Sequence, residues 1–189
     1  MAMTDMPNTV FHSSDAARRT GWAVFLAAAA TAFSFVFSCA TPFAALAAIA
    51  ALNMRRLDAM LTILLAFAIN QAVGFGFLGY PHDTSTIAWG AGIGASALIG
   101  LAAAFATARF ALGAGYVLSL ALSFLAAFAA YQLGLQGAGL LIGTGGHGLS
   151  AEVVRWVLQM NALALAVLAG FQFAGRRLGL SAPLPVRAG

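Results

Sequence analysis

The side chains of this chain that could carry ligand chemistry are few, and they fall in three short polar segments. Its 189 residues include one Cys and three His. Cys39 follows the first apolar stretch, and His82 and Asp83 lie together in a segment that also contains Pro and Tyr. His147 lies in a glycine-rich segment further on. Thiolate, imidazole and carboxylate groups are the side chains that transition metals prefer in proteins. These four residues are therefore candidates for direct metal ligands.

Each of these residues also has a plain structural interpretation. A lone Cys is often a small buried apolar residue, and a single His in a loop is often only a polar surface group. One Cys excludes an internal disulfide and any zinc-finger or haem-attachment spacing. The GTGGHG run around His147 lacks the Lys and Ser/Thr of a phosphate loop, so we interpret it as a flexible cover over a site. Function is indicated only if the three segments meet.

Composition indicates which solvent surrounds the elements that position these segments. Hydrophobic residues make up 62% of the chain and charged residues 7%, and the mean hydropathy is +0.93. A soluble domain could not cover itself with so little polar surface, so most of the chain lies in lipid. The length leaves room for about six spans of roughly 20 residues. We predict an all-α fold, a polytopic bundle of six transmembrane helices.

Apolar stretches separated by polar or Arg-containing segments place the six predicted helices. They cover residues 20–38, 42–54, 57–79, 87–108, 110–133 and 151–174. Residues 1–19 are predicted to be a flexible N-terminal tail, residues 20–174 the transmembrane domain, and residues 175–189 a basic C-terminal tail. Residues 134–150 are expected to form a long glycine-rich loop that could be partly re-entrant.

The arginines predict how the helices are oriented. There is no Lys, and with six spans eight of the nine Arg fall on one side of the membrane. They are Arg18, Arg19, Arg55, Arg56, Arg109, Arg176, Arg177 and Arg187, against Arg155 alone on the other side. Cytoplasmic loops carry the excess of Arg and Lys. Both termini are therefore expected in the cytoplasm of a cell with a bacterial-type inner membrane, and the four candidate ligands on the outer face.

The second predicted helix indicates an outward-facing pocket. Its 13 or so residues would span roughly 20 Å, short of a hydrocarbon core of about 30 Å. The turn that carries Cys39 would then lie below the outer surface, where only protein or a water-filled cavity can surround it. The amides of Asn70, Gln71 and Gln132 lie at membrane depth near the same surface, which favours an interior position. A tilted helix and amides that serve only helix packing are the alternatives.

In layout the chain resembles the substrate-binding S-components of energy-coupling-factor (ECF) vitamin transporters. The resemblance covers residues 20–174 and rests on size, six helices, and a short second helix that runs through Asn53, Met54, Arg55 and Arg56 into a polar-tipped third helix. It implies a transport protein that binds a vitamin near the outer surface under the first, third and fifth loops. It also implies either partner subunits, a scaffold protein and an ATPase, or solitary function, since the chain has no nucleotide-binding motif.

Within that family the single Cys resembles a feature of the solitary cobalamin-transporting type, BtuM, which uses a Cys thiolate toward cobalt, and this implies cobalamin or a related corrinoid as the substrate. Cys39 would then offer a thiolate to cobalt. His82 or His147 could supply an imidazole. Phe43 and Tyr80 would pack against the corrin ring. Its peripheral amides would meet Asn70, Gln71 and Gln132, while Asp83 lies in the same outer loop as His82.

Other functions stay open at this point. A permease for cobalt, nickel or copper would use Cys39, His82, Asp83 and His147 as direct ligands. A non-catalytic accessory subunit of a membrane complex would need none of them. A thiol enzyme based on Cys39 lacks an orienting third group, and we expect no enzymatic activity, no permanently bound cofactor and no nucleic-acid partner. Under each of these functions we expect the chain to contact the lipid bilayer.

Overall fold

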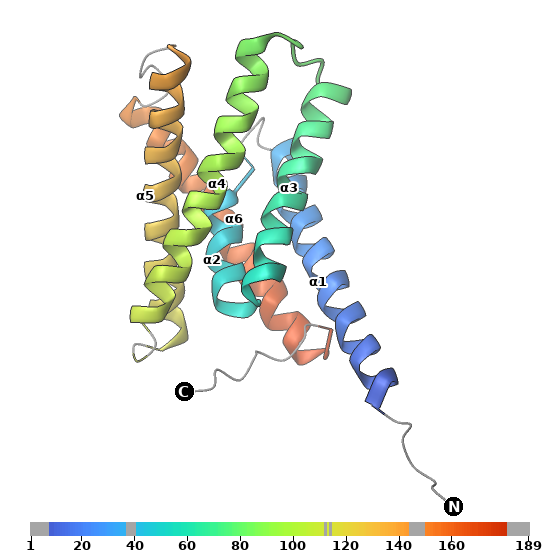
Figure 1. The fold of residues 1–189 in the computed structure, drawn as a ribbon. Coiled ribbons are helices and arrows are strands. Elements are labelled where there is room, and N and C mark those ends of the chain that lie inside the picture. The colour runs from blue at the N-terminus through green and yellow to red at the C-terminus, as the bar shows by residue number, and fades with distance from the viewer. Residues whose placement is uncertain (1–7, 37–40, 112, 114, 144–149, 181–189) are drawn as a thin grey trace, which may run out of the picture.

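The computed structural model describes residues 8–36, 41–111, 113, 115–143 and 150–180, and within them it is all-helical. The helices are α1 (Asn8–Val36), α2 (Phe43–Asn53), α3 (Arg56–Gly76), α4 (Thr84–Phe110), α5 (Tyr116–Ile142) and α6 (Ala151–Arg177) (Figure 1). The described residues contain six helices and no strand, which confirms the predicted all-α class for that part of the chain.

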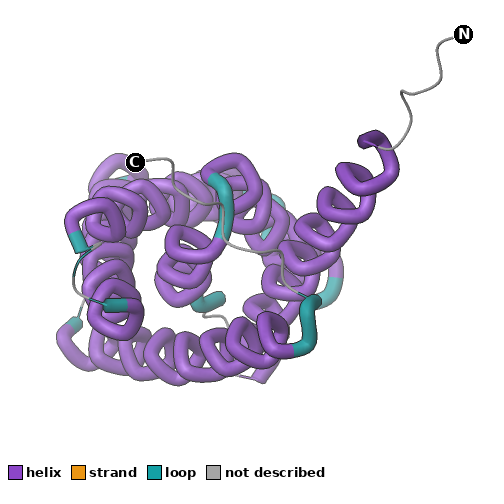
Figure 2. The backbone as a smooth tube through the Cα atoms, turned by 90° about the horizontal axis from the view of Figure 1, so that it is seen from below, coloured by secondary structure: helices purple, strands orange, loops and turns teal. Residues whose placement is uncertain are grey.

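The short helix α2 lies in the middle of the bundle. Figure 2 shows the other helices around it, and α2 packs against each of the five. Ten of its 11 residues are buried. A helix that is apolar on all sides has no face for water, and the six alanines of α2 let the surrounding backbones approach closely. The short apolar stretch predicted over residues 42–54 is therefore the central helix, one residue shorter at each end.

In the part of the chain that the structure describes, four helices are long and apolar enough to cross a membrane: α3, α4, α5 and α6. Their 21–27 residues correspond to about 32–40 Å, against a hydrocarbon core of about 30 Å. Their outer surfaces carry large apolar side chains such as Leu61, Val117 and Leu141, all of them exposed. An apolar exterior on long helices is typical of a multi-pass membrane protein. Because α2 spans only about 16 Å, it is not long enough to cross alone.

Helix α1 begins earlier than predicted. Residues 8–19, assigned above to a flexible tail, are helical, while residues 1–7 lie outside the described residues. Two ion pairs accompany this extension: Asp15 with Arg18 at 2.6 Å, three residues apart, and Arg19 with Asp58 of α3 at 3.8 Å. An ion pair at this spacing stabilises a helix once the apolar part has nucleated it, which the polar composition alone did not reveal.

Helix α5 also runs further than predicted, because its glycines pack instead of ending the helix. It continues to Ile142, although the glycine-rich loop was expected from residue 134. A Cβ on Gly134 would lie 2.9 Å from the Cβ of Ser96 on α4, and one on Gly92 would lie 2.7 Å from the Cβ of Ala138. Small residues at such contacts allow two membrane helices to approach closely. Gly143 follows the last helical residue and caps the helix in the left-handed conformation, with a φ of 78°.

The turn between α4 and α5 follows Phe110 instead of coinciding with Arg109. Residue Gly115, with a φ of 78°, precedes α5 and adopts a conformation that L side chains rarely take. At the other end of the chain, α6 continues three residues beyond the predicted Ala174. The backbone N–H of Leu178 then bonds to the carbonyl of Ala174. These differences shift element ends and leave the order of helices unchanged.

Successive helices run in opposite directions, so the arginines gather at one end of the bundle (Figure 1). We call this the basic end. It is the end of α1, α3, α4 and α6 that carries Arg18, Arg19, Arg55, Arg56, Arg109, Arg176 and Arg177. The opposite end, called the distal end, holds the α3–α4 loop and the start of α6 with Arg155.

A polar cluster ties α2 to its neighbours at the basic end. Asn53, the last residue of α2, donates its side-chain amide to the Ile49 carbonyl at 2.6 Å and to the Tyr116 hydroxyl at 3.3 Å. Arg176 of α6 donates to the Asn53 amide oxygen, and its guanidinium lies 5.4 Å from the centre of the Tyr116 ring. The C-terminus of α2 is thus held by α5 and α6.

Candidate functional site

A cavity of about 240 Å³ lies at the distal end of the bundle, at the N-terminus of α2. Five helices or the residues directly before them supply its walls. The lining residues are Thr41, Phe43, Asn70, Trp89, Ile93, Tyr131, Gln132, Leu135, Val153 and Val157. No charged side chain of the described part of the chain lines it. The first turn of α2 contributes directly to this lining, through Phe43.

The short length of α2 produces the cavity. The 16 Å or so that α2 spans leave roughly half of a 30 Å hydrocarbon core unfilled beyond its N-terminus. Thr41 is 5% exposed and Pro42 is fully buried, so this non-helical backbone lies inside protein, as a membrane interior requires. The side-chain amide of Asn70 on α3 donates to the Thr41 hydroxyl at 2.7 Å. The geometry agrees with the pocket that the short second helix predicts.

Aromatic rings form one part of the wall. The ring centres of Phe43 and Tyr131 lie 6.0 Å apart with their planes tilted by 45°. Trp89 of α4 lines the same cavity. Rings arranged in this way present apolar faces and polar tips to a planar ligand.

Gln132 is a polar side chain of the cavity wall that is available to a ligand. It is 9% exposed, lines the cavity, and makes no side-chain hydrogen bond to any residue in the described ranges. An amide offers two donors and one acceptor oxygen; among the described residues the only fully buried side-chain polar atom without a partner is the Ser123 hydroxyl, so the Gln132 amide is open to the cavity. Water or a bound molecule in the cavity would satisfy it. The arrangement can therefore hold a molecule with complementary donors and acceptors.

Three of the predicted site residues lie in or beside the α3–α4 loop and do not line this cavity. The Tyr80 ring and the His82 ring pack against Phe75, with centres 6.1 and 5.2 Å from it. Asp83 is the N-cap of α4, since its carboxylate accepts from the backbone N–H of Thr86 at 2.7 Å. This hydrogen bond lowers the pKa of Asp83 below its ordinary value. In this structure Asp83 serves as a cap.

The side chain of Gln71 packs against Gly90 of the neighbouring helix α4. It is half-buried on α3, and a Cβ on Gly90 of α4 would collide with its amide. Asn161, another amide at membrane depth, is 2% exposed, accepts from the backbone N–H of Ala45 at 3.4 Å and donates to the Val157 carbonyl at 3.0 Å. The alternative of amides used for helix packing therefore holds for Asn161.

Of the four predicted metal ligands, the structure describes His82 and Asp83. Cys39 and His147 lie outside the described residues. Within the described ranges, no group of three His, Cys, Asp or Glu residues could hold a metal ion. A cobalt or bare-metal site formed by Cys39, His82 and His147 stays a prediction.

The structure thus brings Phe43, Asn70 and Gln132 together, three of the nine residues predicted for the site. Sequence reasoning missed Thr41, Trp89 and Tyr131. The signal for Tyr131 was its position next to Gln132, whereas Trp89 lies near the start of its apolar stretch, where a Trp is common without any ligand. Comparison with protein-family models, with curated proteins and with solved structures gave no match to this chain.

Proposed function

We propose that this chain is a transport protein of a bacterial-type inner membrane that binds a small water-soluble, vitamin-like solute in the distal cavity for uptake. In this proposal all six helices contribute to crossing the membrane, and the distal end faces outward. Both termini then lie in the cytoplasm. The positions of the arginines support this orientation, because cytoplasmic ends of membrane proteins carry the excess of basic residues.

The observation that carries the proposal is the buried amide of Gln132, without a hydrogen bond to the described residues, in an aromatic-walled cavity. Ligand sites are typically apolar clefts with a few placed polar groups. Asn70 and Gln132 supply such groups, and Phe43, Trp89 and Tyr131 supply the apolar surface. The lining favours an uncharged planar ring with hydrogen-bonding edges.

A corrinoid remains a candidate ligand through the resemblance to the solitary cobalamin transporters. The cavity of about 240 Å³ is below the range of about 300–1,000 Å³ that holds drug-sized ligands. A corrinoid would therefore need more room than these walls enclose. Cys39 precedes Thr41 by two residues, a chain distance of at most about 7 Å, so its thiolate is close enough along the chain to serve a ligand in the mouth of the cavity.

One experiment tests both the binding of a vitamin-like solute and the assignment of the Cys39 thiolate to cobalt. Hydroxocobalamin and a panel of one- and two-ring water-soluble vitamins are added separately to the purified chain, and thermal unfolding and visible absorption are recorded. We expect at least one probe to raise the unfolding temperature with saturation. If hydroxocobalamin is that probe, its absorption changes with the wild-type chain and not with Cys39→Ala.

The outcomes separate these two claims. An unchanged hydroxocobalamin spectrum, or the same change in Cys39→Ala, overturns the thiolate–cobalt assignment and leaves the solute-binding proposal standing. Failure of every probe to stabilise the chain contradicts the solute-binding proposal itself.

A further inference from the structure

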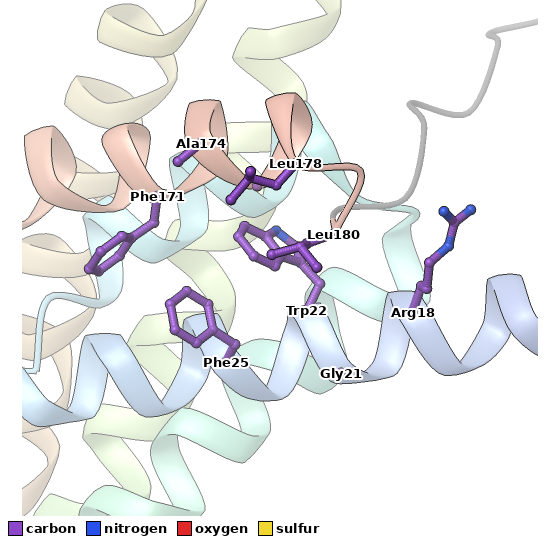
Figure 3. A pocket seen from close by; sticks show the side chains of 9 residues that line it. Arg18, Gly21, Trp22, Phe25, Phe171, Ala174, Leu178 and Leu180 are labelled. Carbon is purple, nitrogen blue, oxygen red and sulfur yellow. The ribbon is translucent and has the colours of Figure 1, made fainter.

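A larger cavity, of about 490 Å³, lies at the basic end between α1 and α6 (Figure 3). We call it the basic-end groove. Its lining residues are Arg18, Gly21, Trp22, Phe25, Phe171, Ala174, Gly175, Leu178 and Leu180. It shares no residue with the distal cavity.

The groove has a defined structure because α1 and α6 are joined across it. The indole N–H of Trp22 donates to the side-chain oxygen of Gln172 at 2.8 Å, and the Trp22 ring packs directly over Gly175. The ring of Phe25 lies 5.2 Å from that of Trp22 and 5.4 Å from that of Phe171. Aromatic contacts of this kind hold the groove open as a shaped surface.

The groove is polar at one end and apolar along its length. Among the described residues Arg18 is the only charged one that lines it, and Phe25 follows Arg18 by two turns of α1, roughly 10 Å along the axis. Figure 3 shows Arg18 at one end and Phe25 and Phe171 at the other. Both phenylalanines are exposed on the surface of a chain whose long helices face lipid.

The charge around the groove favours an anion. The neighbouring turns of α1 and α6 carry Arg18, Arg19, Arg176 and Arg177, against the carboxylate of Asp15 and that of Asp58 on α3, which pairs with Arg19 at 3.8 Å. Arg18 pairs with Asp15 at 2.6 Å and also donates to the Gly179 carbonyl at 3.3 Å, and about half of its side chain remains exposed. Basic pockets between helices at the cytoplasmic side of a membrane bind anionic lipid headgroups.

We propose that the basic-end groove binds one anionic phospholipid, with the headgroup phosphate at Arg18 and an acyl chain along Trp22, Phe25 and Phe171. A lipid fits better than a peptide because the charge lies at one end and the apolar surface extends toward the membrane centre. The inference rests on the membrane location of the helices and does not depend on the ligand of the distal cavity.

Gly21 allows a direct test. It lines the groove, and a Cβ built on it meets no atom within 4 Å, so Gly21→Leu adds bulk to the groove from a position with open space around the Cβ. Gly170 of α6 also has open space around its Cβ and does not line the groove. Gly170→Leu is therefore the matched control. Arg18→Gln removes the positive charge and the ion pair with Asp15, and keeps a polar side chain at the end of the groove.

The full chain in neutral detergent is titrated with phosphatidylglycerol or phosphatidylcholine, with bound lipid counted by native mass spectrometry. We expect one phosphatidylglycerol per chain, bound about fivefold more tightly than phosphatidylcholine, and a loss of that preference in Arg18→Gln. Gly21→Leu should lose the bound lipid, and Gly170→Leu should keep it. Equal binding of both lipids, or undiminished binding to Gly21→Leu, overturns the proposal.

Discussion

Gly134→Leu is expected to force α4 and α5 apart and to lower the free energy of unfolding by about 1–3 kcal/mol, the usual cost of overpacking. A Cβ at this position would lie 2.7 Å from the Ser96 hydroxyl oxygen and 3.1 Å from the Ser96 backbone Cα. The hydroxyl oxygen could rotate away, but the Ser96 Cβ, at 2.9 Å, and Cα are fixed by the backbone and could not. The two helices must therefore separate, and close contact between them is the main source of association in lipid.

The matched control is Gly137→Leu, one turn further along the same helix. No atom lies within 4 Å of a Cβ built on Gly137, so the added side chain meets open space. Chemical or thermal unfolding of the purified variants in one detergent provides the comparison. Equal changes of stability in both variants would show that Gly134 is no more crowded than Gly137 and would contradict the α4–α5 contact.

Gln132→Leu is expected to weaken binding of any probe that stabilises the wild-type chain by at least about fivefold. The substitution replaces the amide with an apolar side chain of similar size. It removes the two donors and the acceptor that Gln132 offers to the cavity. Hydrogen bonds to a buried site that lose their partner cost about 1–3 kcal/mol, which corresponds to this loss of affinity. Titration followed by thermal unfolding or calorimetry measures it.

Gln136→Leu is the control for this substitution. Gln136 lies one turn beyond Gln132 on α5, is exposed, and does not line the cavity. Its replacement should leave the affinity unchanged. If Gln132→Leu binds as tightly as Gln136→Leu, the distal cavity is not the binding site.

The parts of the fold that follow from composition were predictable. A stretch with no polar face had to be buried on all sides, and the brevity of α2 implied a gap beyond its N-terminus. The end of α5 was not predictable in the same way, because a glycine such as Gly134 is compatible with a loop or with a close helix contact. Only the position of Ser96 on the neighbouring helix decides between these two.

The candidate site likewise contains residues that the sequence could predict and residues that it could not. Asn70 and Gln132 could be proposed from the cost of amides at membrane depth, which needs no knowledge of helix rotation. Trp89 and Tyr131 could not, since an aromatic residue suits lipid, interface and cavity alike. Asn161 satisfied the same depth criterion as Gln132, yet it bonds to the backbone of α2. Which of two buried amides remains without a protein partner depends on the packing of α2, and the sequence does not contain that information directly.

The central claim is a water-filled cavity that opens outward, and cysteine labelling tests it most directly. Cys39 is the only Cys, so Cys39→Ser leaves a background in which Gln132→Cys or Leu133→Cys is the sole thiol. Leu133 is 68% exposed on the lipid side of α5, one residue away. A thiol reacts as the thiolate, which requires contact with water.

Intact cells that carry each variant are treated with a charged, membrane-impermeant methanethiosulfonate reagent. We predict labelling of the Gln132→Cys variant from outside and no labelling of the Leu133→Cys variant. Equal reactivity of the two variants, or reaction of the Gln132→Cys variant only from the cytoplasmic face, would contradict the outward-facing cavity.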